Sequence, residues 1–345
     1  MTAALAGLDL PALQRYFEAH VPQTAGPLTA SLLKGGKSNL TYRLNDGTND
    51  WVLRRPPLGP LTPTAHDMAR EYRIVAALQD TNVPVAQAVT LCEDTEVIGV
   101  PFAVVSFVDG HVLQDGDQTA TLTTEQARAC STALVDTLAA LHAVDYTAVG
   151  LAEFGRPAGY LGRQVKRWRG QWDRVATREL DALDRLTDAL RTALPEQAAE
   201  TIVHGDYRLD NTIVARDDFG TIAAVVDWEM ATLGDPLADL GLLQVYWDDR
   251  CEPVLGVRHA PSANPGFLST EEIAERYAAA TGYSLTHLPF YQALGYFKLA
   301  VIAEGIHQRF LAGKTVGEGF ATIGAAVPLL LDAGLETLGG RSAAP

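Results

Sequence analysis

The sequence changes character at Asp109-Gly110, and this change restricts the fold more than any other feature of the chain. Before it, short apolar runs separated by turn signals predict one helix at 65–78 and strands at 29–33, 40–44, 51–54, 88–91 and 100–107. After it, apolar residues recur at helical spacing, which predicts helices at 124–142, 160–175, 180–194, 237–247, 270–280, 290–311 and 316–338. The pattern predicts an α+β chain of two lobes: a small antiparallel sheet with one main helix, residues 1–108, and a larger, mostly helical lobe, residues 109–345.

Composition excludes several classes of protein. Apolar residues make up 47% and charged residues 20% of the 345, a mixture that can bury a core and excludes disorder throughout. Because 42 Asp and Glu stand against 27 Lys and Arg, the net charge of −15 argues against a nucleic-acid-binding protein. The three cysteines are far apart in sequence, which indicates no disulfide framework or cysteine-built zinc site and favours a reducing compartment.

The apolar segments argue against a membrane protein. The N-terminal segment has no basic region and is typical of an amphipathic helix, with Leu13 and Phe17 on its apolar face, rather than of a signal peptide. The most apolar run, 323–331, is interrupted by Pro328 and is too short to cross a bilayer. We therefore expect a cytoplasmic protein that binds neither nucleic acid nor membrane. The oligomeric state stays open.

The sharpest chemical signal is a polar cluster, H-G-D-Y-R-L-D-N at 204–211, followed by D-W-E at 227–229. Short apolar runs flank both pieces, so Asp206, Asn211 and Asp227 are expected at strand ends, where they can converge. Oxygen donors of this kind suit a hard divalent cation such as Mg²⁺, which also binds substrate phosphates. The spacing H-x-D-x-x-x-x-N matches the kinase catalytic loop, in which the Asp takes the proton of the attacking hydroxyl and the Asn binds the metal.

Together with G-D-P-L-A-D-L at 234–240, these motifs resemble the signature of the aminoglycoside phosphotransferase/choline kinase superfamily, and the resemblance covers essentially the whole chain. It implies a protein-kinase-like fold with ATP and Mg²⁺ as cofactors. It also implies Asp206 as the catalytic group and Asn211 and Asp227 as metal ligands. The last motif is expected to be mainly structural, with Asp239 hydrogen-bonded to the backbone of the catalytic loop.

Between the first two predicted strands, a glycine-containing loop resembles the phosphate-covering loop of the family. Its glycines, amides and short polar side chains would contact phosphates: Gly35, Gly36, Ser38 and Asn39. A hairpin uses the same residues, so the position of the loop ahead of the other motifs carries this prediction.

The phosphate-binding cation is predicted to be an arginine where protein kinases have a lysine. Period-two alternation puts Val52 and Arg54 on one face of a strand, so Val52 could contact adenine while Arg54 reaches phosphate. Glu71 on the following helix would orient Arg54. Arg55 is the alternative cation, and a solvated Arg–Arg pair is the alternative without a binding role.

The segment 102–110 resembles the hinge between kinase lobes. Backbone groups at Ser106, Phe107 and Val108 would bind the adenine edge there. Any buried edge strand looks alike, so this prediction rests on position alone. On this basis the lobe 1–108 covers the nucleotide, and the lobe 109–345 carries catalysis and acceptor binding.

One predicted helix bears on the charge of the acceptor. Between residues 156 and 174, six basic residues stand against one acidic residue, and Arg163 and Arg167 lie on a stripe beside the apolar face. Such a stripe favours an anionic partner and would repel a polycationic aminoglycoside, although a salt-bridged, solvated face is the alternative. Glu304 is a further candidate for contact with the acceptor, because the resemblance places its helix beside the acceptor groove.

Longer stretches, among them V-L-R-R-P-P and A-H-D-M-A-R-E-Y-R, resemble one subgroup of the superfamily. This subgroup contains bacterial proteins presumed to be aminoglycoside phosphotransferases and the kinase-like domain of some acyl-CoA dehydrogenases. The latter implies a hydroxyacyl-CoA or a hydroxy acid as acceptor, in agreement with the basic stripe.

The sequence therefore predicts an ATP- and Mg²⁺-dependent phosphotransferase that moves the γ-phosphate to a hydroxyl of a small molecule. A protein kinase is disfavoured, because the chain has no D-F-G and A-P-E pieces with an activation loop between them. Three alternatives stay open: an aminoglycoside-type antibiotic kinase, a nucleotide-binding pseudokinase that regulates a partner, and a metal-dependent hydrolase.

Overall fold

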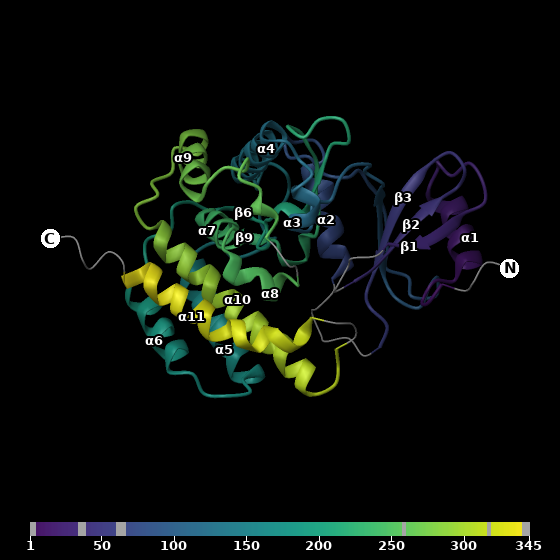
Figure 1. Ribbon diagram of the computed structural model, residues 1–345. Coiled ribbons are helices and arrows are strands. Elements are labelled where there is room, and N and C mark those ends of the chain that lie inside the picture. Colours follow the sequence, from purple (N-terminus) through teal and green to yellow (C-terminus); the bar gives the residue numbers. More distant parts are fainter. Residues whose placement is uncertain (1–4, 34–38, 60–66, 257–259, 316–318, 340–345) are drawn as a thin grey trace. The chain divides into compact units, whose positions relative to one another are not determined.

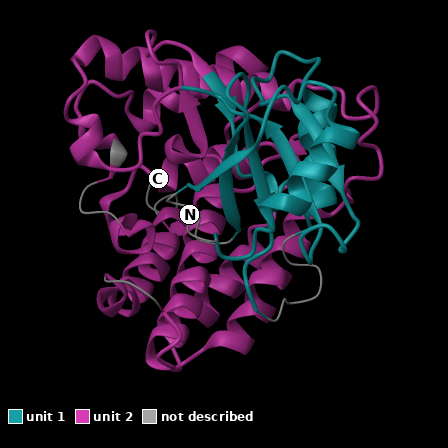
Figure 2. Ribbon diagram, turned by 90° about the vertical axis from the view of Figure 1, so that its right-hand side faces the viewer, with its two compact units in different colours: residues 1–109, 223–231 teal, residues 110–222, 232–345 magenta. Residues whose placement is uncertain are grey.

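The computed structural model describes residues 5–33, 39–59, 67–256, 260–315 and 319–339. Its contacts divide the chain into two compact units, coloured separately in Figure 2: unit 1 is Met1–Asp109 with Ala223–Ala231, and unit 2 is Gly110–Ile222 with Thr232–Pro345. The predicted lobes were continuous in sequence and assigned 223–231 to the second lobe. In the structure this short segment, which carries D-W-E, belongs to unit 1.

Unit 1 is built on a five-stranded antiparallel sheet. Its strands pair in the order β1-β2-β3-β5-β4 and are β1 (Thr29–Leu32), β2 (Leu40–Asn45), β3 (Asp50–Arg55), β4 (Ala88–Cys92) and β5 (Phe102–Ser106). Its helices are α1 (Leu10–His20), α2 (Met68–Leu78) and the 3₁₀ turn η2 (Trp228–Met230). Helix α1 lies against the sheet (Figure 1), where Leu13 and Phe17 join Tyr42, Trp51 and Leu53 in one buried cluster.

Strand β3 alternates between two environments. Trp51, Leu53 and Arg55 are buried, whereas Val52 and Arg54 lie on the opposite face and are half-buried. This alternation matches the period-two pattern of the sequence. It places an arginine on each face, in very different surroundings.

The turn between β2 and β3 is held by Asp46. Its Oδ1 accepts hydrogen bonds from the amides of Thr48 (2.9 Å) and Asn49 (2.7 Å), and its Oδ2 accepts one from the amide of Ala25 (2.7 Å). Burial by itself would raise the pKa of the Asp46 carboxyl, but the three amide donors lower it overall. Gly47 follows with a φ of 92°, a conformation that glycine adopts without steric cost.

Unit 2 is mostly helical. Its α-helices are α3 (Gly116–Thr119), α4 (Thr124–His142), α5 (Tyr160–Val175), α6 (Asp181–Thr192), α7 (Leu237–Val245), α8 (Glu252–Leu255), α9 (Thr270–Thr281), α10 (Leu288–Leu311) and α11 (Ile323–Gly339). Helix α10 is apolar on nearly all sides over its first five turns and packs on α5, α7 and α11 (Figure 1). It is therefore the central helix of this unit's core.

Short strands present the polar loops. β6 (Thr201–Val203) is fully buried and pairs antiparallel with β9 (Thr232–Gly234) in unit 2. β6 leads into a loop and the 3₁₀ turn η1 (Leu209–Asn211), and β7 (Thr212–Val214) follows. β8 (Ile222–Val225) ends just before Asp227. The remaining 3₁₀ turns are η3 (Asp249–Cys251), η4 (Pro261–Ala263) and η5 (Phe320–Thr322).

The predicted α+β architecture is confirmed, with small shifts at element ends. Helices α4 and α5 have the predicted bounds, whereas α10 begins two residues earlier than predicted. The last helix, predicted at 316–338, is α11 at Ile323–Gly339, and the 3₁₀ turn η5 precedes it. The strand β9 and the helices α3 and α8 were not predicted.

One segment among the described residues, Phe320–Gly339, is long and apolar enough to cross a membrane, with a mean hydropathy of 1.3. Its helix continues through Pro328, so the apolar segment is longer than the run considered in the sequence. Only its length and composition meet the criteria for a membrane-spanning helix. The helix packs along α10 with Val327, Leu330 and Leu331 buried, as a core helix does.

Candidate active site

The loop that follows β6 is fixed by the buried Asp239 of α7. Asp239 Oδ2 accepts a hydrogen bond from the amide of His204 (2.7 Å), and Oδ1 accepts one from the amide of Gly205 (2.8 Å). His142 Nε2 lies 3.3 Å from Asp239 Oδ2, and its Nδ1 lies 2.6 Å from the Tyr277 hydroxyl. The bonds predicted from Asp239 to this loop are present, and they also tie the loop to α4 and α9.

Asp206 lies in this loop with hydrogen bonds to both carboxylate oxygens. Asn211 Nδ2 donates to Asp206 Oδ2 (3.0 Å) and to the Asp206 carbonyl oxygen (2.8 Å). The Tyr246 hydroxyl donates to Oδ1, and Arg208 Nε lies 3.5 Å from Oδ2. Burial by itself would raise the pKa of the Asp206 carboxyl, but Arg208, Lys298 and the Tyr246 hydroxyl outweigh it and lower the pKa. These groups therefore stabilise the charged form of the Asp206 carboxyl.

A buried lysine on α10 supports the same loop. Lys298 is 7% exposed, and its Nζ donates to the carbonyl oxygen of Gly205 and lies 5.7 Å from the centre of the Trp168 ring. Burial lowers the pKa of its ammonium group, an effect that Asp206 and Asp239 oppose. The lysine thus connects α10 and α5 to the backbone immediately before Asp206.

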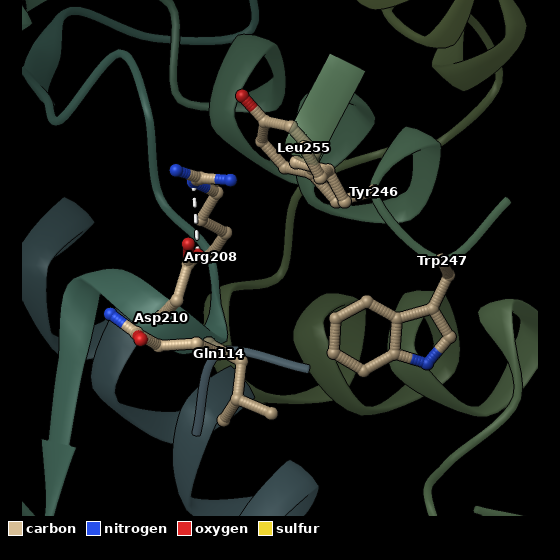
Figure 3. A pocket seen from close by; sticks show the side chains of 7 residues that line it. Gln114, Arg208, Asp210, Tyr246, Trp247 and Leu255 are labelled. Carbon is tan, nitrogen blue, oxygen red and sulfur yellow. Dashed lines mark ion pairs between the residues drawn. The ribbon is translucent and has the colours of Figure 1, made fainter. Parts of the chain in front are cut away.

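A hollow that opens to solvent adjoins this loop. It is lined by Gln114, Arg208, Leu209, Asp210, Tyr246, Trp247 and Leu255 (Figure 3). Arg208 Nε lies 3.0 Å from Asp210 Oδ1, an ion pair drawn dashed in Figure 3, and the guanidinium carbon lies 5.1 Å from the centre of the Tyr246 ring. The hollow therefore combines polar groups of the loop with the apolar walls of Trp247 and Leu255.

In unit 1, Arg54 joins two carboxylates. Its Nη1 lies 3.1 Å from Glu71 Oε2, and its Nη2 lies 3.0 Å from Asp227 Oδ1. Glu71 is 6% exposed and accepts a hydrogen bond on Oε1 from Asn39 Nδ2 (3.1 Å). Burial raises the pKa of Glu71 to about 7, although Arg54 opposes this shift. For Arg54, burial by itself would lower the pKa, but Glu71 and Asp227 raise it overall.

Asp227 has the one positive φ among the described residues other than glycine, with φ 64° and ψ 61°. This left-handed conformation costs most residues roughly 1–2 kcal/mol, and it is found at positions whose side chain must point in one direction. The hydrogen bonds that hold the segment include those from Trp228 Nε1 to the Val225 carbonyl (3.1 Å) and from Arg70 Nη2 to the Ala231 carbonyl (2.9 Å). Together they present the Asp227 carboxylate to Arg54.

Of the two neighbouring arginines, Arg54 contacts the carboxylates. Arg55 is 4% exposed and donates to the carbonyl oxygens of Pro56 (3.1 Å) and Gly7. Its guanidinium is thus used to hold the N-terminal segment against β3. The structure favours Arg54 as the candidate phosphate-binding cation.

Of the remaining predicted nucleotide-binding residues, only some lie in the part of the chain that the structure describes. Three lie outside the described residues: Gly35, Gly36 and Ser38. The Ser106 amide donates a hydrogen bond to the Gln87 carbonyl (2.8 Å), and the Phe107 amide donates to the Asp50 carbonyl (3.0 Å). These two groups are used within unit 1, so Val108, which is half-buried, is the stronger candidate for a backbone donor to adenine.

The two predicted acceptor-binding arginines lie exposed on α5. Arg163 donates to the carbonyl oxygens of Arg156 and Ala158, so its guanidinium caps the start of its own helix. The guanidinium carbon of Arg167 lies 5.4 Å from the centre of the Trp168 ring. Trp168 is also the ring that faces Lys298, whose Nζ donates to the Gly205 carbonyl.

Glu304, the third predicted acceptor-binding residue, is fully buried in unit 2. It accepts hydrogen bonds from the Thr177 amide (2.8 Å), the Thr177 hydroxyl (2.6 Å) and Arg178 Nη2 (3.1 Å). These contacts tie α10 to the segment after α5. They give Glu304 a structural role and provide no support for contact with an acceptor.

The predicted metal ligands have suitable donor atoms. Asn211 directs its amide nitrogen to Asp206, so its carbonyl oxygen is the atom that can bind a cation. Asp227 contacts Arg54 through Oδ1, and its side chain is 36% exposed. An amide oxygen and a carboxylate are the kinds of ligand that Mg²⁺ takes beside waters and phosphates. In the part of the chain that the structure describes, no three His, Cys, Asp or Glu side chains gather as a metal cluster.

A five-stranded antiparallel sheet with an Arg–Glu ion pair and a helical unit that carries H-x-D-x-x-x-x-N define the protein-kinase-like class of phosphotransferases. Within this class, a family model described as "Phosphotransferase enzyme family" (APH) matches residues 29–273. The chain belongs to this family. The predicted family and fold are thereby confirmed.

Known proteins are similar over nearly the whole chain. Acyl-CoA dehydrogenase family member 11 of Gallus gallus is 36% identical over 341 residues, which cover 95% of this chain and 43% of that protein. The chain thus spans less than half the length of this relative. A presumed aminoglycoside phosphotransferase from Ralstonia eutropha JMP134 has a crystal structure with 32% identity and a TM-score of 0.83, covering 96% of this chain and 98% of that one.

More distant structures share the fold. A thermostable variant of an aminoglycoside phosphotransferase, solved in a ternary complex with AMP-PNP and hygromycin B, has a TM-score of 0.59 at 17% identity and covers 94% of this chain and 99% of that one. At this identity the likeness concerns the arrangement of the elements only.

Two contacts of the catalytic loop were not predicted. Tyr246 lies 40 residues beyond Asp206, and Lys298 lies 93 residues beyond Gly205. Tyr246 follows an apolar helix, where nothing in the local pattern marks it. A single lysine within the apolar first part of α10 is a signal that could have been found, because buried lysines need a partner.

Proposed function

We propose that the protein transfers the γ-phosphate of ATP to a hydroxyl group of a small molecule and that it requires Mg²⁺. The observation that carries this proposal is the Asp206 carboxylate, to which Asn211 donates a hydrogen bond in the loop that follows the buried strand β6. The aminoglycoside phosphotransferase of the same fold that was solved with AMP-PNP supports ATP as the phosphate donor.

Each residue then has one task. Asp206 accepts the proton of the acceptor hydroxyl while that oxygen bonds to the γ-phosphorus and the bond from phosphorus to the β-phosphate oxygen breaks. Arg54, oriented by Glu71, binds phosphate oxygens with its guanidinium. The backbone near Val108 and the side chain of Val52 bind adenine.

Asn211 and Asp227 are the proposed ligands of Mg²⁺. When bound, Mg²⁺ supplies positive charge that neutralises the β- and γ-phosphate oxygens. The chain contributes alignment and fixed charge, which account for most of the rate enhancement in phosphoryl transfer.

We further propose an anionic acceptor, such as a hydroxy acid or a hydroxyacyl-CoA. The exposed Arg167 and the buried Lys298, both within about 6 Å of the centre of the Trp168 ring, favour a negative group near the loop. The similarity to acyl-CoA dehydrogenase family member 11 supports an acyl acceptor. The alternative is an aminoglycoside-type acceptor, which the similarity to the Ralstonia eutropha protein favours.

The test measures ADP formation by the purified chain with Mg·ATP and a panel of hydroxyl compounds. The panel contains hydroxy acids of three to eight carbons, their CoA thioesters and several aminoglycosides. We expect turnover with the acids or thioesters. Turnover with aminoglycosides alone would show that the acceptor class is wrong. Mg·ATP binding without transfer to any compound would favour a pseudokinase.

Two variants separate catalysis from binding. Asp206→Asn should lower kcat by about 10³-fold or more, with the Kd of Mg·ATP within about twofold of the wild type, because the amide cannot accept the proton. Asp217→Asn, an exposed carboxylate shortly after β7, is the matched control and should change neither quantity.

A further inference from the structure

Tyr246 donates its phenol hydroxyl to Oδ1 of Asp206, and nothing in the proposed transfer so far uses this residue. The tyrosine is 5% exposed and directly follows the last residue of α7. On its ring face it carries the guanidinium of Arg208, whose carbon lies 5.1 Å from the ring centre. Its ring is therefore held by burial and by Arg208, and its hydroxyl by Asp206.

The donors on Asp206 divide between its two oxygens. Oδ2 receives Asn211 Nδ2 at 3.0 Å and faces Arg208 Nε at 3.5 Å, whereas Oδ1 receives the Tyr246 hydroxyl. A carboxylate offers about four lone-pair positions, two on each oxygen. With one hydrogen bond, Oδ1 has room for a second donor.

Tyr246 also lines the hollow beside the loop that carries Asp206, together with Trp247 and Leu255 (Figure 3). Asp206 is not among the residues that line this hollow.

We propose that Tyr246 is a positioning residue that holds the Asp206 carboxylate in one orientation, so that Oδ1 accepts the proton of the acceptor hydroxyl. This inference rests on the proposed function and deepens it. The phenol raises the barrier to rotation of the carboxylate about its Cβ–Cγ bond, because rotation would break the bonds to both Tyr246 and Asn211. Geometry of this kind affects the transfer step and leaves nucleotide binding alone.

The proposal predicts a split between kinetic parameters. Tyr246→Phe keeps the ring and its contact with Arg208 and removes only the hydroxyl. We expect kcat to fall about 10- to 100-fold, the scale of a small misalignment of a catalytic group, with KM and Kd for Mg·ATP within about twofold of the wild type. Transfer to the panel acceptor with the fastest wild-type turnover and release of phosphate from [γ-³²P]ATP to water are both measured.

The chain contains a matched control. The Tyr296 hydroxyl donates to Asp248 Oδ2 at 2.5 Å, so Tyr296→Phe removes the same type of bond from a carboxylate outside the proposed machinery. It should leave kcat within about twofold of the wild type. An equal loss of kcat in both variants would assign the effect to general destabilisation and overturn the proposal.

Replacing Tyr246 with 4-aminophenylalanine provides the rescue, because its amino group restores a donor at the same place. We expect most of the lost kcat to return. If Tyr246→Phe does not fold, the 4-aminophenylalanine variant still tests the proposal. Its kcat should equal that of the wild type, because its amino group donates to Asp206. An unchanged kcat in a folded Tyr246→Phe variant overturns the inference alone, whereas absence of all turnover in the wild type overturns the proposed function and the inference with it.

Discussion

Arg54 lies between Glu71 and Asp227, with one guanidinium nitrogen 3.1 Å from the first carboxylate and the other 3.0 Å from the second. A single side chain thus joins β3, α2 and the segment 223–231 within unit 1. A planar guanidinium can do this because its two outer nitrogens point to different partners at fixed geometry. An ammonium group has three donors on a single nitrogen and lacks this fixed fork.

The first prediction concerns this bridge. Arg54→Met should lower the free energy of unfolding by about 2–4 kcal/mol, because it leaves the buried Glu71 without its cation. Arg54→Lys should lose less stability and still weaken Mg·ATP binding. Urea denaturation and calorimetric titration measure the two effects. As a control, Arg43→Met breaks the more exposed pair with Asp50 and should cost less than about 1 kcal/mol.

The second prediction separates conformation from charge at Asp227. Asn tolerates the left-handed backbone better than Ala, so Asp227→Ala should be less stable than Asp227→Asn by about 1 kcal/mol. Both variants should lose Mg²⁺-dependent nucleotide binding, because both lack the carboxylate. Retention of wild-type affinity for Mg·ATP in either variant would contradict the proposed role.

The third prediction concerns pH and the turn at Asp46. The pKa of this carboxyl is lower in the folded chain than in the unfolded chain, so its stabilising effect is present above pH about 4 and is lost as the pH falls further. Asp46→Asn should therefore cost about 1–3 kcal/mol at pH 7 and less at pH 3. Asp94→Asn, at an exposed turn where Asp94 accepts a hydrogen bond from the Glu96 amide, is the control and should cost less than about 1 kcal/mol at pH 7.

The fourth prediction tests the structural role of Glu304. Glu304→Gln keeps the size of the side chain but removes the charge that faces Arg178, and we expect a loss of about 2–4 kcal/mol in stability. The KM of the acceptor should not change in the folded fraction. Glu336→Gln, which alters an exposed pair with Arg250, is the control and should cost less than about 1 kcal/mol.

The fifth prediction tests the charge of the acceptor. Arg167→Glu should raise the KM of an anionic acceptor by about tenfold or more and leave the KM of ATP unchanged, because a like charge then faces the substrate. Arg185→Glu makes the same change at an exposed position on α6 and should have no effect on either KM. Equal effects of the two variants would indicate a long-range influence of net charge only.

Much of the fold could be predicted because its elements are long enough to show a period. The apolar positions of α4 repeat over 19 residues, and the alternation in β3 separates Val52 and Arg54 from their neighbours. The catalytic loop could be predicted because its functional groups lie within eight residues of one another, at a spacing that the chemistry requires.

The contacts that the sequence did not reveal come from distant parts of the chain. Tyr246 reaches the loop from the position just after α7, and Lys298 reaches it from α10; both residue types are common in such places with other roles. Glu304 shows the opposite difficulty, because in the sequence a lone carboxylate on a helix looks available to a ligand. In the structure it is bound by Thr177 and Arg178, which lie more than 120 residues earlier. Only packing distinguishes a buried structural carboxylate from one that meets substrate.

The chain enters unit 1 twice, first through residues 1–109 and again through 223–231. An amino-terminal fragment that stops at residue 109 would carry Arg54 and Glu71 but would lack Asp227, and its guanidinium would keep only one of its two carboxylates. To express unit 1 alone, residues 223–231 must be joined to residues 1–109, so a single truncation is not enough. Evolutionary exchange of either half by simple recombination is restricted for the same reason.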